Sequence, residues 1–266
     1  MSQAGGQTLG GVGAVGRGVM EFVGQFGGIA ALTWDVIVSQ LRGPREWTLT
    51  IQQLRVVGVQ SMSIAFLTAA ATGMIFAVQF GWGLRRFGAS LYAGKLVSIA
   101  FVMELGPVLT SLVVGARIGA GITAELGSMR VTEQIDAIRA LGANPVGKLV
   151  APRVIACTLA IPILVMMADL IGTFAAMFIT MASVGVSARF YWDQVLTTVG
   201  IGDLSHGLIK SVFFGYVIGV LGCYYGMRTW GGTQGVGRAT TEAVVSIAIT
   251  ILIADFLLTK MLLPIL

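Results

Sequence analysis

Residues 104–142 read ELGPVLTSLVVGARIGAGITAELGSMRVTEQIDAIRALG. The first part is apolar and rich in glycine, which is typical of a membrane-spanning helix, whereas residues 125–139 mix charged and apolar side chains. Val131, Ile135 and Ile138 recur at positions i, i+4 and i+7, so they lie on one face of a helix. The pattern predicts an amphipathic helix of about four turns between two membrane spans.

This helix is expected to end at Gly142, because glycine commonly caps a helix and Pro145 prevents continuation. Its charged side chains lie largely off the apolar stripe: Arg130, Glu133, Asp136 and Arg139. Such a helix either docks into the groove of a partner protein or lies on the bilayer surface as a connector. Spacing alone does not distinguish these two interpretations.

The composition is that of an integral membrane protein, with 56% hydrophobic residues, 11% charged residues and a mean hydropathy of +0.88. Windows with few or no charges predict five transmembrane helices of about 20 residues. These windows are residues 56–84, 96–116, 154–188, 211–227 and 243–266. The third window is expected to form one long helix, kinked near Pro162. The predicted fold is therefore an all-α integral membrane protein.

Residues 1–50 differ in kind from the rest of the chain. Glycine is frequent in residues 10–18, and the following stretch carries Glu21 and Asp35. This pattern predicts a flexible N-terminus followed by an interfacial helix rather than a sixth span. Residues 51–266 then form the membrane domain.

Lys and Arg positions predict the orientation of the five spans. With the N-terminus inside, 11 of the 17 Lys and Arg residues face the cytoplasm, so the C-terminus lies outside. The six assigned to the outside are Arg85, Arg86, Lys95, Arg189, Lys210 and Lys260. The amphipathic helix is then cytoplasmic. The net charge of +5 fits contact with anionic lipid, and no aromatic-interleaved basic patch indicates nucleic acid.

Enzyme signatures are absent from the sequence, which contains no phosphate-binding loop, no H-E-x-x-H and no G-x-S-x-G. The chain is therefore not expected to hydrolyse ATP. Cys157 and Cys223 lie in apolar windows, where cysteine behaves as a small hydrophobic residue. His206 has too few neighbouring ligands in the sequence to predict a metal site.

Glycines spaced four residues apart predict close packing of helices in the lipid. Three such pairs are Gly115 and Gly119, Gly215 and Gly219, and Gly222 and Gly226.

Three acids fall inside predicted spans, where an ionised carboxylate should face protein or water. Glu104 precedes Gly106-Pro107, and the proline removes one backbone hydrogen bond and can open the helix toward a cavity. Glu104 therefore either lines a polar or substrate-contacting cavity or is satisfied by neighbouring helices. Asp169 and Asp255 favour the second interpretation, with Asp255 close to the membrane edge.

Four segments together resemble the MlaE/YrbE family, the permease subunits of MCE-associated lipid ABC transporters. They are ELGPVLT at 104–110, the stretch 115–138, Pro152-Arg153, and GVGRATT at 235–241. The resemblance covers nearly the whole chain beyond the N-terminal tail, so residues 51–266 would form a permease domain. It implies a homodimer in the bacterial inner membrane.

The resemblance also implies partners. A cytoplasmic coupling helix would dock on a separate P-loop ATPase dimer, which would bind ATP and Mg²⁺, while this chain itself holds no cofactor. The residues expected to take part in coupling are Glu125, Arg130, Glu133, Asp136 and Arg139. The apolar stripe would face either the ATPase or the permease's own helices. A periplasmic ring of MCE-domain proteins is implied, and a STAS-domain protein is an optional further partner.

In similar permeases phospholipid occupies a cavity between the two protomers. By position in the matching segment, Phe76, Leu84 and Phe87 would contact acyl chains and Glu104 would lie near the cavity. Relatives often have an arginine directly before this glutamate, but here the residue is Met103. Glu104 therefore needs another partner.

The predicted function is the permease subunit of an ABC transporter that moves phospholipid between the inner membrane and a periplasmic MCE protein. One alternative is an ion- or proton-coupled secondary transporter that uses the three intramembrane acids. The other is a membrane scaffold or embedded enzyme that recruits cytoplasmic proteins through residues 125–139. The first alternative would require inverted repeats, which the sequence does not contain.

Overall fold

The computed structural model describes residues 5–42 and 46–264 of the chain, and these residues are helical with no β-strand among them. Five of its helical segments are long and apolar enough to cross a membrane. They are Trp47–Arg85, Ser90–Val131, Val146–Val184, Ile201–Met227 and Gly232–Leu262. The predictions of an all-α membrane protein and of five spans are confirmed.

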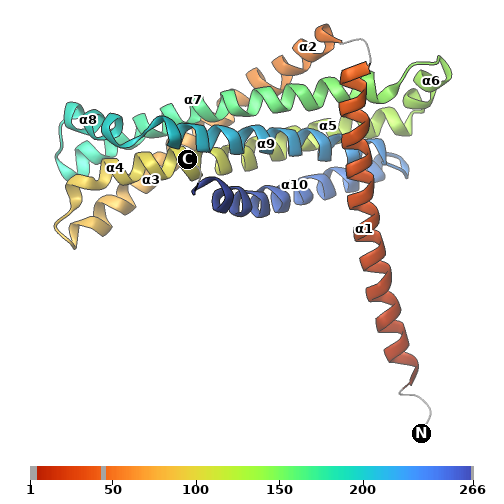
Figure 1. Cartoon of the computed structure of the whole chain (residues 1–266), viewed down its shortest axis with the longest axis horizontal. Helices are drawn as coiled ribbons and strands as arrows, with labels where there is room; N and C mark the ends of the chain where they lie inside the picture. The colour runs from red at the N-terminus through yellow and green to blue at the C-terminus, as the bar shows by residue number, and fades with distance from the viewer. Residues whose placement is uncertain (1–4, 43–45, 265–266) are drawn as a thin grey trace.

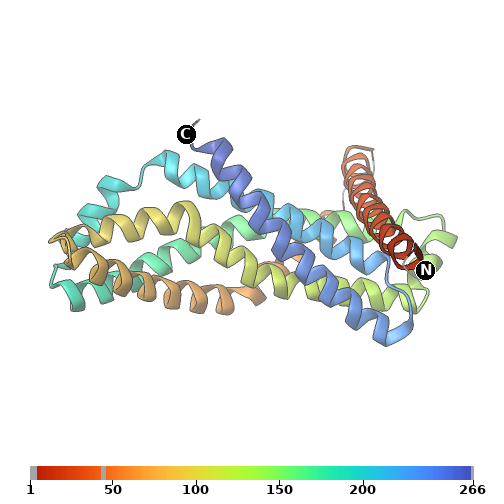
Figure 2. The same ribbon diagram turned by 90° about the horizontal axis from the view of Figure 1, so that it is seen from below.

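The spans pack side by side as a bundle, with α6 (Gln134–Ala140) at one end and α8 (Ala188–Thr198) at the other (Figure 1). We call these the α6 end and the α8 end. Figure 2 shows α10 (Gly232–Leu262) running obliquely across the other spans.

Each span begins earlier in the structure than the sequence predicted. The first span begins at Trp47 rather than after Arg55, the fourth at Ile201 rather than residue 211, and the fifth at Gly232 rather than residue 243. Helices continue past the apolar windows because backbone hydrogen bonds and packing tolerate polar residues near span ends and on buried faces. The third span ends earlier than predicted, at Val184, because Gly185 adopts a left-handed conformation with φ 79°.

Several spans combine more than one helical element. The first consists of α2 (Trp47–Gly58), η1 (Val59–Ser61) and α3 (Met62–Arg85). The second consists of η2 (Ser90–Tyr92), α4 (Ala93–Ala100), the π-helical η3 (Phe101–Leu105) and α5 (Gly106–Val131). The third joins η4 (Val146–Val150) to α7 (Ala151–Val184), a single helix that contains Pro162 as predicted. The fourth is α9 (Ile201–Met227).

Glycines allow the spans to approach closely. A Cβ atom on Gly215 of α9 would lie 2.5 Å from the Cys157 carbonyl oxygen of α7, and one on Gly119 of α5 would lie 2.3 Å from Ile247 of α10. Cys157 and Cys223 are buried free cysteines in the same core. The predicted glycine-mediated packing is confirmed.

Helix α1 (Gly5–Arg42) crosses the bundle near its α6 end and projects beyond it (Figure 1). It contacts α9 and η4. The helix runs through the glycine-rich residues for which the sequence predicted a flexible tail. The division at residue 50 and the interfacial position of this helix stay predictions.

One local prediction failed, and one helix was missed. The amphipathic segment 125–139 is not one helix, because α5 continues to Val131 and the chain turns at Glu133, whose φ of 60° is left-handed. The break lets Ile135 fold back and become buried, with 1% of its surface exposed. Helix α8 was not predicted at all, although Ser187 caps its first turn by accepting a hydrogen bond from the Phe190 amide.

Candidate functional site

An ionic cluster joins three spans toward the α8 end. The Lys210 ammonium of α9 lies 2.5 Å from Glu104 Oε2 and 2.9 Å from Asp255 Oδ1 of α10. Thr259, one turn after Asp255, donates a hydrogen bond to Glu104 Oε1 at 3.2 Å. We call these four residues the ionic cluster.

The backbone of the second span prepares this site. Glu104 lies in the π-helical turn Phe101–Leu105, which widens the helix, and Pro107 lacks the amide hydrogen that would bond to the preceding turn. Lys210 Nζ lies 3.4 Å from the carbonyl oxygen of Met103, four residues before the proline. Lys210 therefore contacts the Glu104 carboxylate and also the Met103 carbonyl oxygen, which receives no hydrogen bond from the Pro107 nitrogen.

Burial within the ionic cluster is graded. The Lys210 side chain is fully buried, Asp255 is 20% exposed and Glu104 is 36% exposed. One ammonium between two carboxylates leaves an excess of negative charge on the open side if both acids are ionised. Buried charges of this kind persist only when they are paired and hydrogen-bonded. The arrangement offers a fixed polar group at the edge of an otherwise apolar bundle.

The ionic cluster answers two questions that the sequence left open. Lys210 is the cationic partner of Glu104, which in this chain follows Met103. Asp255 is satisfied by a neighbouring helix, as the sequence favoured, because it is a second partner of the same lysine. Sequence reasoning missed Lys210 and Thr259, and it counted Lys210 among the outside charges because the predicted fourth span began one residue later. Glu104 had no cation within its predicted window 96–116, and that was the signal that a cation from another span was needed.

Asp169 lies apart from the ionic cluster, against the second span. A Cβ atom on Gly106 would lie 1.6 Å from Asp169 Oδ1, so the glycine of the E-L-G-P motif makes room for this carboxyl group. Asp169 also lines an apolar cavity of about 340 Å³ beside α8.

The residues predicted to contact acyl chains belong to a different part of the protomer. Phe76 is half-buried on α3, with its ring centroid 6.0 Å from that of Phe80. Leu84 is half-buried near the end of α3, and Phe87 is 83% exposed in the turn that follows. Helix α3 packs mainly on α7, whereas the ionic cluster lies between the second, fourth and fifth spans. Within one chain the structure does not bring these three residues to Glu104.

The predicted coupling residues separate into two groups. Arg130 Nη1 lies 2.7 Å from Asp136 Oδ2 across the break between α5 and α6, and Arg139 Nη1 lies 3.4 Å from Asp136 Oδ1. These pairs hold the short helix in place, with Glu133 at the junction. Ile135 is buried against the chain's own helices, so that part of the apolar stripe faces the permease.

Glu125 has a different neighbour. Its Oε1 accepts a hydrogen bond from Arg153 Nη2 at 2.7 Å, and Arg153 also donates to the Leu149 carbonyl at 2.6 Å. Glu125 therefore ties α5 to the start of α7 inside this chain.

Comparison with known proteins gives a consistent result. A family model described as "Permease MlaE" matches residues 50–261. The chain is 38% identical over 232 residues to the protein TRIGALACTOSYLDIACYLGLYCEROL 1, chloroplastic, of Arabidopsis thaliana. This match covers 87% of this chain and 66% of the Arabidopsis protein. It is 35% identical over 248 residues to a probable ABC transporter permease protein of Rickettsia typhi, covering 93% of this chain and 96% of the relative. A probable ABC transporter permease protein of Synechocystis is 37% identical over 227 residues, covering 85% and 86%.

Proposed function

The chain belongs to the MlaE permease family, and from that premise we propose that it carries phospholipid through an ABC transporter of the bacterial inner membrane. It is a multi-pass ABC transporter permease, a class whose energy comes from a separate ATPase. In the proposal two copies form a homodimer, a P-loop ATPase dimer binds ATP and Mg²⁺ at the α6 end, and a periplasmic MCE ring covers the α8 end. A STAS-domain protein can complete the assembly.

The observation that carries the proposal is the ionic cluster. Lys210 holds Glu104 in place while more than a third of the glutamate side chain stays open, so a polar headgroup can meet a fixed charge at the edge of an apolar bundle. Acyl chains would lie along apolar span surfaces, and Phe76, Leu84 and Phe87 are the candidates for this contact. The name of the Arabidopsis relative contains a glycerolipid, which supports a diacyl lipid as the substrate.

The proposed orientation places the N-terminus and α6 in the cytoplasm and the C-terminus in the periplasm. The Arg130–Asp136–Arg139 network then faces the ATPase, and Glu133 lies at the hinge between α5 and α6. Nucleotide binding would move α6, and the movement would pass to α5. Because α5 and Glu104 belong to the same span, α5 would transmit the movement toward Glu104.

Purification from native membranes in mild detergent tests the proposed assembly. We expect mass spectrometry to recover a P-loop ATPase, an MCE-domain protein and phospholipid together with this chain. Recovery of the chain alone, under several detergents and after crosslinking, would contradict the proposed partners.

A further inference from the structure

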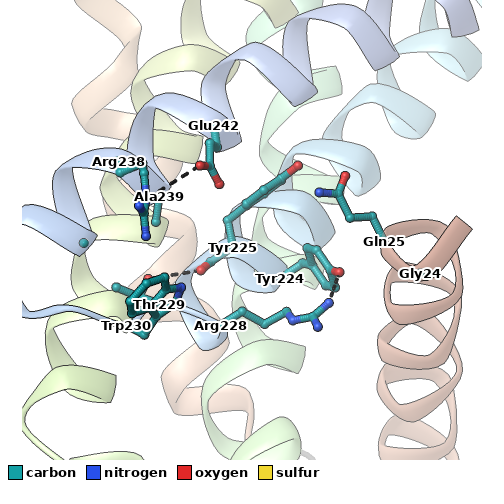
Figure 3. Close-up of a pocket in the computed structure, with 11 residues that line it drawn as sticks. Gly24, Gln25, Tyr224, Tyr225, Arg228, Thr229, Trp230, Arg238, Ala239 and Glu242 are labelled. Carbon is teal, nitrogen blue, oxygen red and sulfur yellow. Dashed lines mark hydrogen bonds and ion pairs between the residues drawn. The ribbon is translucent and has the colours of Figure 1, made fainter. Parts of the chain in front are cut away.

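A second cavity, of about 390 Å³, lies at the α6 end, where α9 turns into α10 beside α1 (Figure 3). Its wall combines aromatic, cationic and polar side chains from α1, α9, α10 and the turn between α9 and α10. The lining includes Gln25, Tyr224, Tyr225, Arg228, Trp230 and Arg238. The ionic cluster lies in the opposite half of α9, so this is a separate site.

Glycines fix the shape of this cavity. Gly231 and Gly232 have φ values of 89° and 70°, which permit the tight turn between the two helices. A Cβ atom on Gly28 of α1 would lie 2.9 Å from the Tyr224 ring and 3.2 Å from Arg228. Helix α1 therefore approaches α9 closely beside the cavity.

The two arginines of the cavity are short of anionic partners. Arg228 donates a hydrogen bond to the Tyr224 hydroxyl and lies 5.1 Å from the centroid of the Tyr224 ring. In the part of the chain that the structure describes, no carboxylate forms an ion pair with it. The guanidinium carbon of Arg238 lies 4.8 Å from the centroid of the Trp230 ring, and Arg238 Nε lies 3.9 Å from Glu242 Oε1.

The Arg238–Glu242 pair contributes little, because both side chains are more than half exposed and the contact is long. Among the side chains that the structure describes, the cavity therefore holds two guanidinium groups and one weakly engaged carboxylate. The aromatic rings orient both guanidinium groups. One Nη1 donor of Arg228 is used by the Tyr224 hydroxyl, and the remaining N–H donors of the two arginines are available to a ligand.

We propose that this cavity binds the phosphate headgroup of a phospholipid in the adjacent leaflet. Guanidinium groups form bidentate hydrogen bonds with phosphate oxygens. Trp230 is 71% exposed at the span end, a position that suits an aromatic side chain at a membrane interface. Val23 and Trp34 of α1 are 63% and 66% exposed, so apolar surface for an acyl chain lies on the helix that borders the cavity.

Glu242 can contact a second part of the same headgroup, because its carboxylate can accept a hydrogen bond from an ammonium group such as that of ethanolamine. The inference extends the proposed function by a second lipid site at the ATPase-facing end. It rests on the proposed function only for the identity of the leaflet.

Photocrosslinking tests the site directly. The full-length protein is placed in vesicles of digalactosyldiacylglycerol, which lacks phosphate, with a small fraction of phosphatidylethanolamine that carries a photoreactive headgroup. We expect labelled peptides from residues 224–242. The Arg228→Gln, Arg238→Gln double variant should lower this labelling about tenfold, since two charge-assisted contacts are lost.

Matched variants control for folding and for charge. Arg86 stacks over Trp82 at 4.1 Å at the α8 end, so Arg86→Gln removes a similar pair and should leave labelling of residues 224–242 unchanged. The double Arg→Lys variant keeps both charges and should lose less labelling than the double Gln variant. Gly24 lines the cavity with no atom within 4 Å of its Cβ position, so a side chain can leave the helix there and Gly24→Trp should occupy the site.

Three results would overturn the proposal. One is undiminished labelling in both the double Gln variant and Gly24→Trp. A second is equal labelling by a photoreactive diacylglycerol, because the phosphate would then not be recognised. The third is displacement by inorganic phosphate as effective as displacement by unlabelled phosphatidylethanolamine, which would assign the site to a free anion. The experiment needs no ATPase, so failure of the proposed transport would leave its outcome unaffected.

Discussion

The ammonium of Lys210 lies 2.5 Å from the carboxylate of Glu104, although 106 residues separate them in the sequence. This contact joins the fourth span to the second at the π-helical turn that precedes Pro107. Asp255 of the fifth span lies 2.9 Å from the same ammonium. Lys210 therefore links three spans, and the proposed lipid contact at Glu104 depends on it.

Replacement of Lys210 by methionine should destabilise the protein strongly. The change leaves two carboxylates together without a cation, and loss of one partner from a buried ionic group costs about 3–5 kcal/mol. We expect a clear fall in the thermal unfolding midpoint in detergent.

Lys260→Met is the matched control, because Lys260 is an exposed lysine on α10, and it should leave the midpoint unchanged. Adding Asp255→Asn to Lys210→Met should recover much of the lost stability by removing one of the uncompensated charges. A Lys210→Met protein as stable as the wild type would show that the ionic cluster does not stabilise the fold.

Gly73→Ala should weaken the contact between α3 and α7. The new methyl group would lie 2.1 Å from the Gly172 carbonyl oxygen, which is a backbone atom, so the two helices must separate. We expect a loss of about 1–3 kcal/mol in the free energy of unfolding, as for other overpacked positions. Gly83→Ala lies on the same helix with nothing within 4 Å and should not destabilise the protein. Equal unfolding midpoints for the two variants would contradict the close helix contact.

Asp136→Lys should impair binding of the ATPase. The substitution replaces the shared partner of Arg130 and Arg139 with a third positive charge, so α6 loses the ion pairs that position it. We expect much less ATPase to copurify with this variant, while the unfolding midpoint changes by only the small amount typical of exposed ion pairs. Asp193→Lys, at an exposed position on α8, should copurify normally. Undiminished copurification of the ATPase with Asp136→Lys would argue against coupling through α6.

Tyr191 should give the stability of the protein an alkaline pH dependence. Burial raises the pKa of Tyr191 above its ordinary value of 10.0, and its hydroxyl donates to the Thr173 carbonyl at 3.2 Å. The folded protein therefore keeps this proton at a pH where the unfolded chain has released it. The resulting stabilisation is complete below pH 10.0 and declines as the pH rises beyond it.

Tyr191→Phe should flatten that decline when unfolding midpoints are measured between neutral pH and pH above 10.0. Tyr92→Phe removes an exposed tyrosine and should retain the wild-type slope. The same slope in both variants would assign the alkaline loss of stability to other groups.

Hydropathy was sufficient to predict five spans, because the cost of placing polar residues in lipid acts on each segment separately. It could not define the span ends, since the window that began at residue 211 excluded Lys210. In a hydropathy window, a buried lysine is indistinguishable from a lysine that marks the end of a span. Only the acids on other spans that pair with it show that it is buried. Those pairings depend on tertiary structure, which local composition does not encode.

The amphipathic segment illustrates a similar limit. Its spacing grouped Val131, Ile135 and Ile138 on one face, but only Ile135 is buried, whereas Val131 is exposed on α5. Gly142 is left-handed just beyond the end of α6, as a helix-ending glycine should be. The break at Glu133 was not predicted, because no glycine or proline marks it. The Arg130–Asp136 pair and the burial of Ile135 both depend on that turn, and such interactions can offset the strain of a left-handed residue.

The most direct test of the central claim is lipid movement in vesicles that contain this permease and its copurified ATPase. A fluorescent phospholipid should change leaflet or leave the membrane only when ATP and Mg²⁺ are supplied. Glu104→Gln, which removes the charge from the exposed side of the ionic cluster, should reduce the rate about tenfold or more while ATPase binding persists. Phospholipid movement that needs no ATP, or that follows a proton gradient and is unaffected by Glu104→Gln, would contradict the account.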